Sequence, residues 1–217
     1  MGERHMRTHA TKHVLMALLV FVTGATGVTA QETEDALAAY RAGKYAEAVR
    51  ICMVELESMP RNMNSYAVLG WSLVALGRFD EALENGLRGF SVSPRDPRII
   101  EILGEAHYHL GNNLEALNYF EQYAVVASTG DRIEDVYYFM GEIFIRLEEY
   151  HHADIALAAA VYHAPNSSTW WARLGYAREM AGDVRYALEA YESALALNSS
   201  LTEALRGRDR VRNAAPG

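Results

Sequence analysis

Cysteine is almost absent from this sequence: Cys52 is the only one in 217 residues. A single thiol cannot close an internal disulfide or build a Cys-based zinc or iron–sulfur site. We expect Cys52 to be a buried, inert thiol rather than an intermolecular disulfide partner. Basic residues are also scarce, with 20 Lys and Arg against 28 Asp and Glu, a formal net charge of −8. A duplex-binding protein normally needs a dominant basic surface, so no nucleic-acid partner is expected.

Motifs of the common enzyme classes are missing as well. The sequence has no G-x-S-x-G, no P-loop, no H-E-x-x-H and no G-x-G-x-x-G. Catalysis needs a constellation of groups held at hydrogen-bonding distances, and no motif indicates one. We therefore assign no catalytic residue and no cofactor, and expect a protein that is not an enzyme.

The first thirty residues have the pattern of an export signal. A basic stretch precedes an uncharged apolar run over residues 14–22, and Val28 and Ala30 precede Gln31 as an A-x-A-like cleavage site. The prediction is a signal peptide over residues 1–30 and a periplasmic mature chain. The alternative is an uncleaved anchor: residues 14–30 are at the lower limit of a membrane-spanning length, and would attach the protein to the inner membrane. Low cysteine content favours the bacterial periplasm over a eukaryotic secretory route.

After residue 30 the chain repeats itself. Each unit has the apolar spacing of two amphipathic helices of about 14 residues. A glycine separates the two helices in four units and supplies the positive φ that ends the first, and Glu148 stands at this position in the fourth unit. One hairpin cannot bury its apolar face alone, but stacked hairpins share a continuous core. A small residue recurs in the first helix at spacings of 34, 34, 37 and 34 residues, as Ala36, Gly70, Gly104, Gly141 and Gly175, and we expect it to let the two helices of a hairpin approach closely.

This pattern resembles the tetratricopeptide-repeat family over roughly residues 31–201. In the second unit the signature positions hold Tyr66, Leu69, Gly70, Gly77, Phe79, Ala82 and Pro94, and in the fifth they hold Trp171, Leu174, Gly175, Gly182, Ala187, Tyr191 and Ala194. The resemblance implies an all-α superhelix (solenoid) of about five helical hairpins plus a C-terminal capping helix. The predicted single domain spans residues 31–213, with repeats at about 31–62, 63–96, 97–130, 134–167 and 168–201 and the capping helix at 202–213. In the capping helix Leu205 is expected to cover the last hairpin, and residues 129–132 form an insertion between units three and four.

The resemblance also implies where a ligand would bind. In this family the first helices of the hairpins line a concave groove that commonly holds a peptide or an extended segment. Aromatic rings there would act as anchors, because they bury much area at low entropic cost. Arg98 and Arg146 would meet carboxylates of a partner, while Glu101, Glu105 and Glu142 would meet basic groups. The predicted groove residues are Tyr40, Trp71, Arg98, Glu101, Glu105, Tyr108, His109, Tyr138, Glu142, Arg146 and Tyr176.

These expectations describe an interaction module that captures a protein or peptide partner in the cell envelope. Two alternatives stay open: a structural solenoid that self-associates as a homo-oligomer, and an accessory component of an envelope transport complex that binds a small ligand or a metal. Glu101, Glu105 and His109 recur every four residues on one helix face. That stripe has the ligand types of a cation site, but no partner ligand is indicated on another helix, so we assign no metal. Membrane association is expected only if the N-terminal segment is not cleaved.

Overall fold

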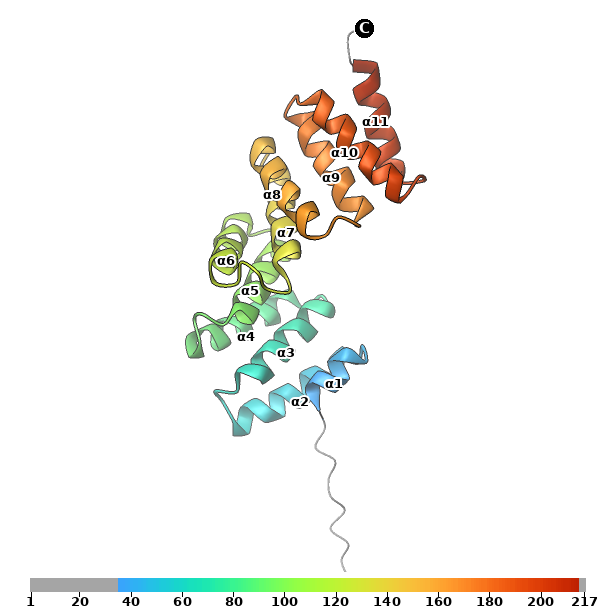
Figure 1. Cartoon of the computed structure of the whole chain (residues 1–217). Helices are drawn as coiled ribbons and strands as arrows, with labels where there is room; N and C mark the ends of the chain where they lie inside the picture. Colours follow the sequence, from blue (N-terminus) through green and yellow to red (C-terminus); the bar gives the residue numbers. More distant parts are fainter. Residues whose placement is uncertain (1–34, 215–217) are drawn as a thin grey trace, which may run out of the picture. The chain divides into compact units, whose positions relative to one another are not determined.

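The computed structural model describes residues 35–214, and the predicted signal peptide lies outside them. Within this part of the chain every regular element is an α-helix (Figure 1). None of these helices has both the length and the apolar character needed to cross a membrane. The helices are α1 (Ala36–Arg41), α2 (Tyr45–Ser58), α3 (Met63–Ala75), α4 (Phe79–Val92), α5 (Pro97–Leu110), α6 (Asn113–Val126), α7 (Ile133–Arg146), α8 (Tyr150–His163), α9 (Ser168–Met180), α10 (Val184–Leu197) and α11 (Thr202–Ala214).

The helices pack as five successive antiparallel hairpins, α1–α2 to α9–α10, followed by the single helix α11. Each hairpin also packs on the next. Of the leading helices α1, α3, α5, α7 and α9, each of the first four contacts the leading helix that follows, and α9 contacts α11. Figure 1 shows this stack running from the blue hairpin α1–α2 to the orange hairpin α9–α10, with the red helix α11 at its end. The predicted all-α superhelix of five hairpins and a capping helix is confirmed. Hereafter, the side formed by the leading helices is called the leading-helix face.

The two helices of each hairpin begin in different ways. Four leading helices start at a side-chain N-cap, Asp35, Asn62, Asp96 or Ser167, whose oxygen accepts from backbone N–H groups of the first turn. The second helices have no such cap. They follow a turn with positive φ, adopted by glycine in four hairpins and by Glu148, at φ 60°, in the fourth. Glycine enters this left-handed region without steric cost, whereas a side chain does not.

The glycines inside the leading helices have a different role from the one expected. A Cβ on Gly104 would lie 2.5 Å from the Phe120 ring, because that ring from α6 fills the space above the glycine. Gly141 and Gly175 receive Leu157 and Tyr191 in the same way. These glycines make room for a large side chain of the second helix, rather than bringing two backbones together.

The second hairpin solves the same packing problem with a residue from the next repeat. Its second helix carries Gly86 where the later hairpins carry Phe120, Leu157 or Tyr191. The space over Gly70 is filled instead by Ile102 of α5, whose Cδ1 would lie 2.6 Å from an added Cβ. Hairpins two and three therefore share one core, in which Leu69, Ile102 and Leu103 are fully buried.

The C-terminal helix α11 covers the last hairpin, but through other residues than expected. Ala204 and Val211 are buried, and Gly207 lies directly on the Tyr191 ring, whereas Leu205 is only partly buried. The Tyr191 ring leaves room only for a residue without a side chain above it, so the closest contact of α11 is made at Gly207. The prediction for Leu205 is corrected accordingly. The predicted burial of Cys52 is confirmed, and burial raises the pKa of its thiol to about 12.

Candidate functional site

Trp71 is the residue that several cavities of the leading-helix face share. It lines three cavities, of about 510, 410 and 340 Å³. The side chain lies on α3 and is half-buried. Its Nε1–H donates to Glu101 Oε2 of α5 over 3.1 Å, which fixes the plane of the indole. A large ring held in one orientation is the kind of anchor on which protein recognition often depends.

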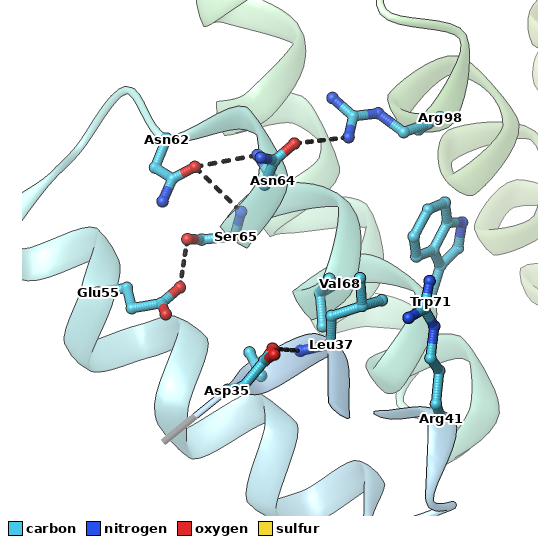
Figure 2. Close-up of a pocket in the computed structure, with 11 residues that line it drawn as sticks. Asp35, Leu37, Arg41, Glu55, Asn62, Asn64, Ser65, Val68, Trp71 and Arg98 are labelled. Atoms are coloured by element: carbon cyan, nitrogen blue, oxygen red, sulfur yellow. Dashed lines mark hydrogen bonds between the residues drawn. The ribbon is translucent and has the colours of Figure 1, made fainter. Parts of the chain in front are cut away.

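The largest of these cavities is polar on one side (Figure 2). Asn62 accepts from the backbone N–H groups of Asn64 and Ser65, and Ser65 donates its hydroxyl proton to Glu55. Arg98 donates to Asn64 Oδ1 over 2.8 Å, so the amide NH2 of Asn64 keeps its donors for a ligand.

The charge of Arg98 is already matched by its neighbour on α5. Its guanidinium makes two bonds to the Asp96 carboxylate, of 2.9 and 2.6 Å. Arg41 also lines the cavity, and it has no ion pair or hydrogen bond to any residue within 35–214. Among the described residues, Arg41 rather than Arg98 therefore presents a positive charge without an ion pair at this end of the leading-helix face.

Glu101 and Glu105 lie at the centre of the leading-helix face and share one cation. Arg132 Nη2 lies 2.9 Å from Glu101 Oε1 and 3.3 Å from Glu105 Oε1, and its Nη1 lies 3.0 Å from Asp135 Oδ2. The Glu101 side chain is 2% exposed and that of Glu105 is 11% exposed. We name Glu101, Glu105, Arg132 and Asp135 the central cluster. Its carboxylates outnumber its cation by three to one.

This imbalance determines the protonation of the cluster. Burial, followed by the charge of Glu101, raises the pKa of Glu105 to about 8. Burial also raises the pKa of Asp135. The neighbouring carboxylates hold the pKa of Arg132 above its ordinary value despite burial, so Arg132 stays charged. Near neutral pH, Glu105 therefore carries a proton for much of the time.

A second cluster lies further along the leading-helix face. Glu142 is paired by Arg173, with bonds of 2.6 and 3.0 Å, and Arg173 also reaches Glu203 of α11. The Tyr138 ring stacks on Trp170 with centroids 4.9 Å apart. Burial raises the pKa of Tyr138 to about 12. We name Glu142, Arg173 and Glu203 the distal cluster.

The remaining predicted residues lie between or beside these clusters. Arg146 stacks over the Tyr108 ring at 3.9 Å and donates to the Tyr108 carbonyl. Tyr176 is half-buried, 5.3 Å from the Arg173 guanidinium. Tyr40 packs against Trp71 with centroids 5.9 Å apart. Most of the charged groove residues that were predicted to meet a binding partner therefore have partners within the protein itself.

His109 does not join the carboxylates of its stripe. Its ring stacks on Phe79 at a centroid distance of 4.3 Å, and burial lowers its pKa. Nowhere in residues 35–214 do three or more His, Cys, Asp or Glu residues come together as metal ligands. The cation that the two glutamates meet is the guanidinium of Arg132.

Arg132 and Arg173 are absent from the groove residues predicted from the sequence, although a periodic signal was present. Glu101–Arg132, Glu142–Arg173 and Glu179–Arg210 are ion pairs between side chains 31 residues apart. This separation, slightly shorter than the repeat, joins a leading helix to the residue before the next leading helix (Arg132), to the middle of the next leading helix (Arg173) or to α11 (Arg210). A search for acid–base pairs at nearly one repeat length would have found all three.

Comparisons with known proteins agree with this architecture. A tetratricopeptide-repeat family model matches residues 68–132. A crystal structure of MamA superposes with a TM-score of 0.68 at 19% identity, covering 76% of this chain and 95% of that chain. A thermophilic tetratricopeptide-repeat protein of Thermus thermophilus gives a TM-score of 0.57 at 22% identity, covering 82% and 94%. A comparison with curated proteins found no match.

One further similar structure is a much longer chain. The crystal structure of the APC/C hetero-tetramer Cut9–Hcn1 gives a TM-score of 0.69 at 16% identity, covering 81% of this chain and 35% of that chain. At these identities the likeness concerns the fold. The repeat register and the stack of hairpins give this chain the fold of tetratricopeptide-repeat proteins, and residues 68–132 match the repeat model itself.

Proposed function

We propose that the protein is a non-enzymatic scaffold that captures a peptide or protein segment along its leading-helix face. The observation that carries this proposal is the position of Trp71, a half-buried, oriented indole that three adjoining cavities share. The tetratricopeptide fold supports it, because stacked hairpins create an extended surface of the kind used to bind other proteins.

The polar groups beside Trp71 suit an extended backbone. The Asn64 amide retains donors, and Arg41 and Asn62 line the same cavity. Peptide carbonyls accept from such groups, while the indole contributes apolar contact. Tyr138, stacked on Trp170, offers a second aromatic anchor further along the face.

The setting we propose is the cell envelope, with residues 1–30 removed on export. The basic, apolar and small-residue order of that segment supports export. The alternative is that residues 14–30 are retained as an inner-membrane anchor, and the two possibilities predict different masses for the recovered protein. Mass spectrometry of the protein isolated from cells is expected to give a chain beginning at Gln31, and an intact N-terminus would contradict cleavage.

The capture proposal is tested by replacing Trp71 and Tyr138 with alanine together. The tagged double variant, recovered from an envelope extract, is expected to lose at least 90% of the co-purifying partner. The matched control replaces Tyr162 and Tyr186, which lie on second helices and are exposed, and it should retain the partner. Circular dichroism checks that both variants fold. A folded W71A/Y138A variant with full partner recovery would refute the proposal.

Self-association is a second candidate because of the exposed apolar side chains on the second helices. Val125 is 82% exposed and Tyr162 is 83% exposed. Isolated surface apolar groups are common in soluble proteins, so this observation is weaker than the shared indole. Sedimentation at several concentrations separates the candidates, since a monomer that retains its partner eliminates self-association as the function.

A further inference from the structure

The 410 Å³ cavity beside Trp71 combines aromatic walls with negative charge. Tyr40 of α1 and Trp71 of α3 line one part of it, and Glu105, Asp131 and Arg132 line another. Val74 and Ala75 complete the lining with small apolar surface. The cavity therefore has an apolar side, suited to a hydrocarbon stem, and an ionic side, suited to a charged head.

The two rings are held in place from outside the cavity. Their centroids lie 5.9 Å apart with the planes tilted by 35°. Trp71 is fixed by its bond to Glu101, and Tyr40 also packs against Tyr45, with centroids 5.5 Å apart. Aromatic faces attract organic cations, and indole does so most strongly.

The charges around the cavity do not balance. The guanidinium of Arg132 is shared among Glu101, Glu105 and Asp135. Asp131 adds a fourth carboxylate, and none of its side-chain contacts in residues 35–214 is an ion pair or a hydrogen bond. Four carboxylates therefore face one cation, and Glu105 is the one that is both buried and in the cavity wall.

We propose that this cavity binds a primary alkylammonium group, the side chain of a lysine in the captured partner segment. The inference rests on the proposed function, because the lysine belongs to the segment that the leading-helix face captures. The ammonium would lie against Glu105 and Asp131, and the alkyl stem would lie against Trp71 and Val74. A compact ammonium fits this position better than a second planar guanidinium, because the Arg132 guanidinium already lies beside the carboxylates and donates from Nε and Nη2 to Glu101 Oε1.

The first test uses n-butylammonium as the probe and the full chain as the receptor. The ¹H–¹⁵N resonance of the Trp71 indole, assigned with a W71F variant, reports binding. We expect a saturable shift in the millimolar range. 1-Butanol has the same stem without the charge and is expected to give no saturable shift. Equal shifts with both probes would overturn the proposal.

The receptor variants identify the carboxylate. Glu105→Gln is expected to weaken butylammonium binding at least fivefold at pH 8. Glu84→Gln changes the net charge equally at an exposed position of α4 and should leave binding unchanged. A folded E105Q variant that binds as tightly as the unsubstituted protein would contradict the role of Glu105.

A pH series supplies a readout that a purely structural role would not give. Alkylammonium groups stay protonated below about pH 10, whereas Glu105 ionises near pH 8. The groups facing it are Tyr40 from α1, Glu101 from its own helix, and Asp131, Arg132 and Asp135 from the segment entering α7. Affinity for butylammonium should rise between pH 6 and 9 in the unsubstituted protein and stay nearly flat in E105Q.

A peptide pair distinguishes a partner lysine from a free amine. We expect a blocked pentapeptide, Gly-Gly-Lys-Gly-Gly, to shift the Trp71 resonance, and its Nε-acetyl-lysine form to have no effect. Equal binding of the two peptides would overturn the lysine assignment. If neither n-butylammonium nor the lysine peptide binds, but W71A/Y138A loses the partner, the cation site is refuted and the capture proposal stands. Amine binding with full partner recovery in that variant would do the reverse.

Discussion

The central and distal clusters use the same ion-pair spacing but differ in how their charges are balanced. In each, an arginine reaches back 31 residues to a glutamate of the preceding leading helix. The central arginine faces three carboxylates, and the two on α5 are almost fully buried. The distal arginine faces two: Glu142 is 14% exposed, whereas Glu203 is 45% exposed.

The difference shows how one repeat architecture can produce two kinds of site. In the distal cluster Arg173 matches Glu142, which is 14% exposed, one to one, and water screens the excess charge at Glu203. Glu101 and Glu105 are largely buried, and burial together with the excess negative charge raises the pKa of Glu105 and leaves the adjoining cavity short of positive charge. The unbalanced, buried charge therefore lies at one place in the solenoid, where the 37-residue spacing inserts Arg132, and is not repeated in every hairpin.

Removing the arginine of each cluster should give the largest contrast between them. Arg132→Met leaves two buried carboxylates without a cation, and we expect it to lower the free energy of unfolding by about 3 kcal/mol. Arg173→Met leaves one largely buried carboxylate, Glu142, without a cation instead of two, and should cost less, about 2 kcal/mol. Urea unfolding of both variants measures the difference.

The double variant R132M/E105Q is the control for this contrast. Because it removes one of the orphaned carboxylates, it should recover part of the stability lost in R132M. Equal losses in the two single arginine variants would show that burial of the central carboxylates does not matter.

The stability of the protein should depend on pH through Glu105. The folded state keeps a proton on this carboxyl up to about pH 8, while an unfolded chain releases it near the ordinary value of 4.5. The folded state therefore binds the extra proton between these values, and stability falls as pH rises through this window. E105Q removes this contribution, so by pH 9 it should gain about 2 kcal/mol relative to the unsubstituted protein, compared with pH 5.

Comparison with E105Q isolates this effect from other titrating groups. Burial lowers the pKa values of His107 and His109, and these shifts act in the opposite direction near pH 6. Asp135, with its raised pKa, acts in the same direction as Glu105. The E84Q variant should follow the unsubstituted protein across the whole pH range. Parallel curves for E105Q and the unsubstituted protein would refute the assignment.

The fold can be predicted from the sequence because every hairpin carries the same local sequence signals. Glycines at regular spacing and apolar periodicity each act within a few residues, so the five units support the same prediction. The site was less accessible, because ion pairing depends on which side chains meet between hairpins. The repeat pattern predicts Glu101 and Glu105 as groove residues, but it places Arg132 in an insertion and assigns it no role. The packing of Ile102 over Gly70 also depends on a neighbour 32 residues away, which a periodic pattern does not specify.

The smallest expected effect compares the turns inside the third and fourth hairpins. Glu148 has φ 60°, where a side chain is strained, whereas Gly111 adopts φ 80° at the equivalent turn. Glu148→Gly should therefore stabilise the fourth hairpin by about 1 kcal/mol, and Gly111→Ala should destabilise the third by about the same amount. An added Cβ on Gly111 meets no atom within 4 Å, so its cost would come from the backbone alone. Urea unfolding of both variants measures the two shifts, and a loss of stability in E148G would mean that the Glu148 side chain stabilises the turn by more than its backbone strain.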